Sequence, residues 1–318
     1  MSLSVSATIV RKCSARHSVT NTAVDDPEST PVTAQDIPPE IGAFLASLSE
    51  HAPSNDAALV MRAALARRSA APLQSPPTDD EVAAFGRAVD DVQRTLDLLT
   101  PGDWQQPAVN GLTVGELVGH LIGTQVAMAA DLGRGAPLNN SDDHIEATRP
   151  AIIAAVGAGP VEAAAEFARA TTIVTSHLAS LDSQGLSAPA RFGGVTADIK
   201  FVLLARVFEL WTHDNDLRRA VGLARVDPDT GRLWMMTRAV MPLVRLVGDA
   251  RIRFVVTGAG GGVWPAEGDE IAEIAIDAIA FCRRVANRID VGDLHAETSG
   301  DGAIADRTLS ALAGLALD

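Results

Sequence analysis

Apolar residues recur at alternating spacings of three and four along several stretches of this chain, a pattern typical of amphipathic helices with one buried face. The clearest stretch follows residues 78–81 (TDDE), which have the form of a capping box, and it ends at Pro101 and Gly102. We expect its apolar positions to form one buried stripe, made of Val82, Phe85, Val89, Val92, Leu96 and Leu99.

Further helices follow the same pattern. Thr113 and Glu116 fit a second capping box, which opens a helix whose apolar set reaches Ile122. Pro160 is placed to open another helix, since proline is well tolerated in the first turn, and Pro242 should kink the last helix of the series. The expected spans of the later helices are 142–156, 160–181, 197–220 and 228–246.

The pattern changes at Arg251, where apolar and other residues begin to alternate as they do in a half-buried strand. Glycines at 258 and 260–262 predict a turn rather than a phosphate-binding loop, because they do not match the spacing of such loops and no helix follows directly. The expected elements are strands over 251–257, 263–264, 271–276 and 294–298, and helices over 277–288 and 303–315.

The N-terminal region differs from both of these parts. Residues 1–37 are rich in Ser, Thr, Pro and Ala with little periodicity, which predicts disorder, and short helices are expected only over 41–48 and 57–68. The fold class is therefore expected to be mainly α. The expected domains are a largely disordered extension at 1–78, a helical bundle at 79–248 and a small α+β domain at 249–318.

Composition and charge argue against several classes of function and site. The formal net charge of −14 disfavours binding to nucleic acid, since an acidic surface repels phosphate backbones. The sequence holds no run of 18 apolar residues, so no membrane span is expected. Two cysteines, Cys13 and Cys282, make neither a disulfide framework nor a zinc–thiolate site, which favours a reducing cytoplasm. Tyrosine is absent, so catalysis must use other groups.

One segment carries the most informative chemistry. Glu209 and His213 are four residues apart within the helix expected over 197–220, so their side chains lie on one helix face about a turn apart. A carboxylate and an imidazole in this arrangement offer two ligands to a divalent metal ion, and His120 is the candidate for a third. The alternative is an ordinary i,i+4 contact on a solvated face, with His120 a core or surface residue.

Asp216 and Cys282 each have two possible interpretations. Asp216 lies one turn beyond His213 and could orient a metal-bound imidazole, or it could simply pair with Arg219. Cys282 precedes two arginines that could lower its pKa, although a buried structural cysteine explains it better. The remaining histidines have no partner at a recognisable spacing and are left out of the site: His17, His51, His144, His177 and His295.

Two separated segments resemble the mycothiol-dependent maleylpyruvate isomerase-like family. They are LTVGELVGHL, which contains His120 and follows Asp103 and Trp104, and FELWTHDNDLRRAVG, which contains Glu209 and His213. The pieces VTGAGGGVW and FCRRVANR resemble the small carboxy-terminal domain of that family. The likeness covers roughly residues 80–318.

This resemblance implies a DinB-like four-helix bundle that holds a divalent metal, generally zinc, with His120, Glu209 and His213 as its ligands. It also implies mycothiol as the thiol cofactor. The family has a functional arginine in its carboxy-terminal domain, and Arg288 is the matching residue, preceded by Asn287 where a glycine is common.

The function that the resemblance implies is a mycothiol-dependent isomerase or S-transferase acting on a small electrophile. A metal-bound thiolate would be the nucleophile, because a bound cation favours the thiolate form, and the arginine would clamp a substrate carboxylate. Two alternatives remain at this point. One is a non-catalytic metal- and thiol-binding sensor, and the other is a structural or regulatory helical module whose N-terminal segment recruits a partner.

Overall fold

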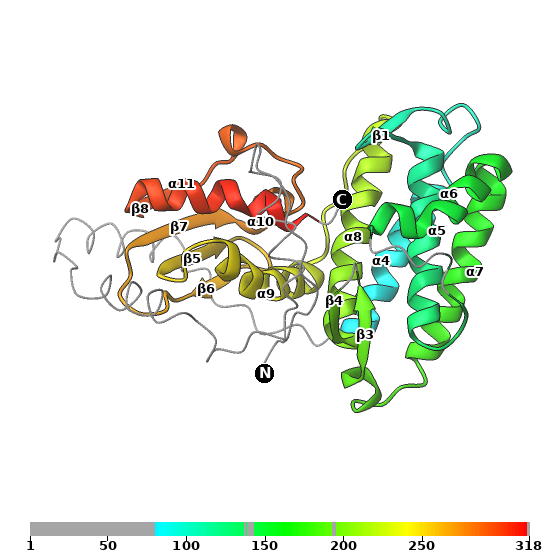
Figure 1. Ribbon diagram of the computed structural model, residues 1–318. Helices are drawn as coiled ribbons and strands as arrows, with labels where there is room; N and C mark the ends of the chain where they lie inside the picture. Colours follow the sequence, from blue (N-terminus) through cyan, green and yellow to red (C-terminus); the bar gives the residue numbers. More distant parts are fainter. Residues whose placement is uncertain (1–79, 137, 139–142, 193–194, 317–318) are drawn as a thin grey trace, which may run out of the picture. The chain divides into compact units, whose positions relative to one another are not determined.

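The computed structural model describes residues 80–316 except 137, 139–142 and 193–194 (Figure 1). The predicted N-terminal extension, with its disorder and short helices, lies outside the described residues. The described chain divides into two compact units between Ala239 and Val240. The division falls inside a helix, and the boundary predicted after residue 248 stays a prediction.

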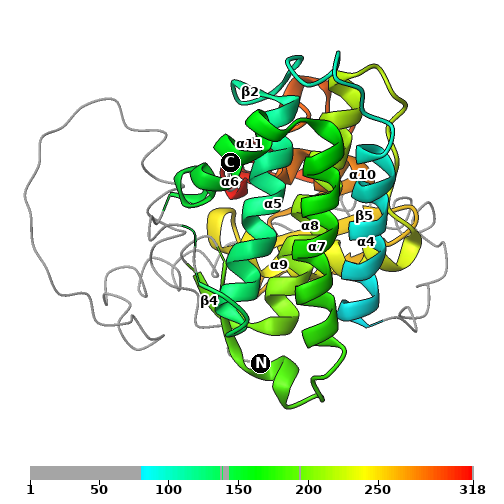
Figure 2. The same ribbon diagram turned by 90° about the vertical axis from the view of Figure 1, so that its right-hand side faces the viewer.

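Four long helices of the first unit form a closed bundle. α4 (Glu81–Leu96) packs against α8 (Ile199–Ala220) and α7 (Pro160–Leu178), and α5 (Val114–Asp131) packs against the same two helices from the other side. Figure 2 shows these four helices running along one direction. α6 (His144–Ala158) lies against α5, and α9 (Thr230–Val247) follows the bundle along the chain. The predicted helical bundle is confirmed.

The stripe predicted for the first helix is the buried face of α4. Phe85, Val89, Val92 and Leu96 are buried there, and each such side chain contributes roughly 1.5–3 kcal/mol through loss of apolar surface from water. The predicted start of this helix needs a correction. Asp80, rather than Thr78, caps α4, because its side chain accepts a hydrogen bond from the amide of Ala83.

Two short hairpins, which the sequence pattern did not predict, lead into the two helices that carry the candidate site. β1 (Pro107–Val109) and β2 (Leu112–Thr113) precede α5, while β3 (Pro189–Phe192) and β4 (Val195–Asp198) precede α8. Each hairpin ends on the residue that caps the next helix. Thr113 caps α5 in the predicted capping box with Glu116, and Asp198 accepts from the amide of Phe201.

The second unit is a four-stranded sheet with helices packed on it. The strand order is β6-β5-β7-β8, with β5 and β7 parallel and the two outer pairings antiparallel. The predicted small α+β domain is confirmed. Its elements are β5 (Ile252–Thr257), β6 (Gly262–Trp264), β7 (Ala272–Asp277), α10 (Ala278–Val285), β8 (Glu297–Gly300) and α11 (Gly302–Ala311). Short 3₁₀ helices within the described residues lie at Gly185–Ser187, Val291–Asp293 and Leu312–Leu315.

Within the described part of the chain, no helix combines the length and the apolar character needed to cross a bilayer.

α5 and α6 approach closely because α5 carries glycines where they meet. A Cβ atom added to Gly119 would lie 2.5 Å from Cα of Ile152, and one added to Gly123 would lie 2.5 Å from Cβ of Thr148. Real Cβ atoms do not come this near other heavy atoms. The two glycines therefore set the distance between the helices.

We expect Gly119→Ala to lower the free energy of unfolding by about 1–3 kcal/mol, since the added methyl group meets backbone that can only move with the whole helix. Gly86→Ala is the matched control. It lies within α4 with nothing within 4 Å of the added atom, so it should raise stability by about 0.5–1 kcal/mol. Urea unfolding followed by circular dichroism measures both. Equal effects would contradict a tight α5–α6 contact.

Candidate metal centre

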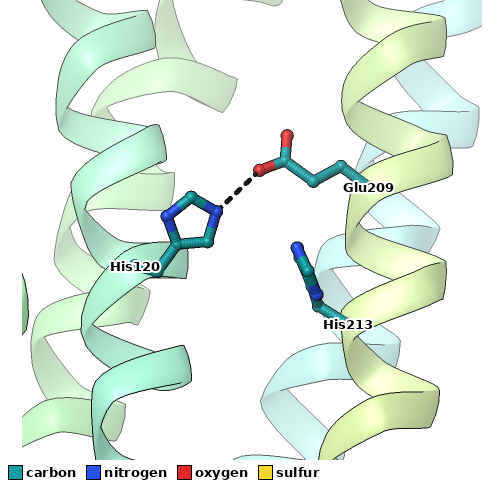
Figure 3. A group of neighbouring side chains, drawn as sticks. All are labelled: His120, Glu209 and His213. Atoms are coloured by element: carbon teal, nitrogen blue, oxygen red, sulfur yellow. Dashed lines mark ion pairs between the residues drawn. The ribbon is translucent and has the colours of Figure 1, made fainter. Parts of the chain in front are cut away.

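Three side chains predicted from the sequence meet between α5 and α8. His120 comes from α5, and Glu209 and His213 come from α8 one turn apart (Figure 3). One ligand atom from each of them lies within 4.8 Å of the other two. All three side chains are at least nine-tenths buried, with exposed fractions of 0%, 9% and 4%. The structure therefore brings the predicted trio together in a position sheltered from water.

Hydrogen bonds fix which nitrogen of His120 carries its proton. Nδ1 of His120 lies 3.0 Å from Oγ1 of Thr148. The Thr148 hydroxyl donates its single proton to the carbonyl oxygen of Ile145, so it can only accept from the imidazole. Nδ1 of His120 is therefore protonated, and Nε2 presents a lone pair toward Glu209 and His213.

His213 is oriented in the same way from its own helix. Its Nδ1 lies 3.2 Å from a carboxylate oxygen of Asp216, which accepts the proton and leaves Nε2 with a lone pair. The other oxygen of Asp216 accepts from Arg219 at 3.3 Å. Asp216 therefore pairs with Arg219 and also contacts the imidazole of His213, and its role toward a metal-bound imidazole stays a prediction.

No group in the described part of the chain donates a hydrogen bond to the lone pair on Nε2 of His120. Nε2 lies 3.2 Å from Oε1 of Glu209, yet it makes no hydrogen bond with any group in the described part of the chain. Burial lowers the pKa of His120 to about 4, an effect that Glu209 opposes, so the ring is neutral at pH 7. A buried acceptor that receives no hydrogen bond destabilises the fold, and a cation bound among the three ligand atoms would interact with this lone pair. The donor set therefore fits a metal ion.

Glu209 is held ionised by its neighbours. Arg206, one turn earlier on α8, pairs with Oε2, and Nε2 of His144 lies 3.0 Å from Oε1. Burial acts to raise the pKa of Glu209, but the charge of Arg206 and the contacts with His144 outweigh it and hold that pKa well below its usual range. The carboxylate is therefore negatively charged at any pH at which a metal would bind.

Two of these partners were missed in the sequence. His144, left out there as a histidine without a partner, opens α6 and contacts Glu209, which corrects that interpretation. No spacing signal could have found it, because 65 residues separate it from Glu209. Arg206 was within reach, since it lies three residues before Glu209 on the same helix, a spacing typical of an ion pair.

The remaining candidates belong to the second unit. Arg288 donates to the carbonyl oxygen of Ala286 at 2.8 Å, and its functional role stays a prediction. Asn287 has a φ of 55°, a backbone conformation that glycine adopts freely, which explains why glycine is common at this position in the family it resembles. Cys282 is fully buried and burial raises the pKa of its thiol, so it is a structural residue. The predicted glycine turn is confirmed between β5 and β6.

Comparisons with known proteins support the same family. Residues 85–218 match the family described as mycothiol maleylpyruvate isomerase N-terminal domain. Among solved structures, the mycothiol-dependent maleylpyruvate isomerase resembles this chain with a TM-score of 0.51 at 14% identity, over 68% of this chain and 91% of that one. A histidine-to-alanine mutant of that enzyme gives 0.52 over the same shares.

A DinB-like protein from Bacillus cereus ATCC 10987 matches 46% of this chain and 94% of its own length, at 16% identity and a TM-score of 0.34. A search of curated proteins found no match. At these identities the structural likeness to the isomerase establishes the fold alone. The matched residues include α5 and nearly all of α8, the two helices that carry the trio, so the match supports the resemblance that the motifs indicated.

Proposed function

We propose that this protein is an enzyme that binds a divalent metal ion, zinc in the first instance, and uses mycothiol to act on a small electrophile. The observation that carries the proposal is the buried trio of His120, Glu209 and His213, in which Nε2 of His120 has a lone pair and no donor. The family match and the likeness to a mycothiol-dependent maleylpyruvate isomerase support the choice of thiol and reaction.

The ligand set favours a catalytic rather than a structural metal. The trio offers two imidazole nitrogens and one carboxylate oxygen, and three protein ligands would leave a position open for another molecule. A divalent cation held there would supply the positive charge that favours the thiolate form of a bound thiol.

The chain's own residues prepare the site for that chemistry. Thr148 and Asp216 hold the two imidazoles in the tautomer that binds a metal, and Arg206 keeps Glu209 ionised. Thr148, Asp216, Arg206 and the two imidazoles are buried, and the exclusion of water strengthens electrostatic interactions in the site. Arg288 is our candidate for binding a substrate carboxylate, since a guanidinium can hold one with two hydrogen bonds.

The reaction that we propose is isomerisation of a cis double bond conjugated to a carbonyl group. The thiol sulfur and its proton would add across the double bond, rotation would follow, and elimination would return both the thiol and the trans product. Arrest after the addition would make the protein an S-transferase. A cytoplasmic location stays a prediction, supported by the need to keep the thiol reduced.

Metal analysis tests the ligand set. We expect purified wild type to hold nearly one equivalent of zinc or a similar metal, and His120→Ala, Glu209→Ala and His213→Ala each to lose it, because two remaining ligands hold a cation poorly. His177→Ala is the matched control, since His177 is in α7 and pairs with Arg134. Elemental analysis after gel filtration gives the ratio. Full retention of metal by His213→Ala would refute the site.

Turnover tests the reaction. We expect wild type with mycothiol to convert maleylpyruvate to its trans isomer, followed by absorbance, and His213→Ala to be inactive. Metal and mycothiol binding without turnover of maleylpyruvate or other small electrophiles would instead indicate a sensor.

Substitution of Arg288 tests the substrate contact. Arg288→Met should raise KM by about 10- to 100-fold, the effect of losing a hydrogen bond to a charged group, and leave the metal content unchanged. Arg283→Met, on α10 nearby in sequence, is the control. An unchanged KM in Arg288→Met would exclude the proposed carboxylate contact.

A further inference from the structure

One histidine near the trio is still without a role. We propose that His144 is a positioning residue of the metal site, which donates a hydrogen bond to Oε1 of Glu209 and so aims that oxygen at the metal without binding the metal itself. This inference rests on the proposed function, because it assigns a role toward the cation that the trio would hold.

His144 and His120 both approach Oε1 of Glu209, but they interact with it differently. Nε2 of His144 and Nε2 of His120 lie 3.0 Å and 3.2 Å from Oε1 of Glu209. His144 makes a hydrogen bond with that oxygen, whereas the Nε2 of His120 does not. Among the described residues, the ligand atoms that gather within 4.8 Å come from His120, Glu209 and His213. His144 therefore meets the carboxylate in a hydrogen bond, while Nε2 of His120 lies beside the same oxygen with its lone pair available to a cation.

Arg206 leaves only one oxygen of Glu209 for a metal. Its guanidinium pairs with Oε2 through Nη1, and its Nη2 donates to Oγ1 of Thr124 at 2.6 Å. The arginine side chain is 1% exposed, so it is fixed by packing as well as by these bonds. With Arg206 on one oxygen and His144 on the other, the carboxylate cannot rotate freely. Oε1 is then the oxygen that remains to bind a cation.

α6 brings His144 to this place together with a second group. His144 is the first residue of the helix, and Thr148, one turn later, accepts from Nδ1 of His120. The His144 ring also contacts the His120 ring edge-on, with 4.9 Å between the centroids. α6 can come this close because Gly119 and Gly123 of α5 carry no side chain. α6 thus orients one ligand on each of the helices α5 and α8.

His144→Phe and His144→Gln separate a positioning role from other roles. Phenylalanine keeps the ring packing and removes the donor, while the glutamine amide restores an N–H at a similar reach. Loss of a group that orients a metal ligand typically weakens metal binding by 10- to 100-fold. We expect that loss for His144→Phe and recovery to within a few-fold of wild type for His144→Gln. His177→Phe is the matched control.

The readouts are the zinc dissociation constant, from competition with a chromophoric chelator, and the visible absorption spectrum of the cobalt-substituted protein. The spectrum of His144→Phe should keep the wild-type band pattern with a small shift, since the set of ligands is unchanged. Circular dichroism confirms that each variant is folded.

Other results would overturn the inference. Loss of zinc from both His144 variants, together with a changed band pattern when excess cobalt loads the site, would make His144 a ligand. Unchanged affinity and spectrum in His144→Phe would give it no role at the metal. In both cases wild type binds metal and His213→Ala does not, so the proposed function survives. A wild type that binds neither zinc nor cobalt would overturn the proposed function and this inference together.

Discussion

A carboxylate buried between helices is the constraint on which this bundle depends. Glu209 could not remain ionised in the core without positive or hydrogen-bonding partners, since the cost of removing its charge from water is several kcal/mol. Two such partners are Arg206 on α8 and His144 on α6. The contacts that stabilise the charge therefore also link α6 to α8.

The periodicity of the sequence was sufficient to predict the helices and part of the site. Glu209 and His213 lie on one helix, so their separation in sequence determines their separation in space. The buried stripe of α4 follows from the same rule. His120 was proposed as the third ligand from its residue type, and the family resemblance gave the same trio. Periodicity could not place it beside this helix, because nothing local relates α5 to α8.

The contact of His144 with the site and the hairpins before α5 and α8 could not be predicted from periodicity. β2 has two residues, and a strand this short carries no alternation to detect. His144 opens a helix whose position depends on how near α6 can come to α5, and that distance is set by Gly119 and Gly123. Packing between helices, rather than any property of the segment 144–158 itself, makes the histidine part of the site.

The ion pair between Arg206 and Glu209 has a consequence for any cation that the trio would hold. The carboxylate and the guanidinium cancel in formal charge, and both oriented imidazoles present unprotonated nitrogens. An arriving dication would thus keep its full double charge, instead of being half neutralised by a lone carboxylate. Such an electron-poor centre attracts an anionic sulfur more strongly than one with an uncompensated acidic ligand.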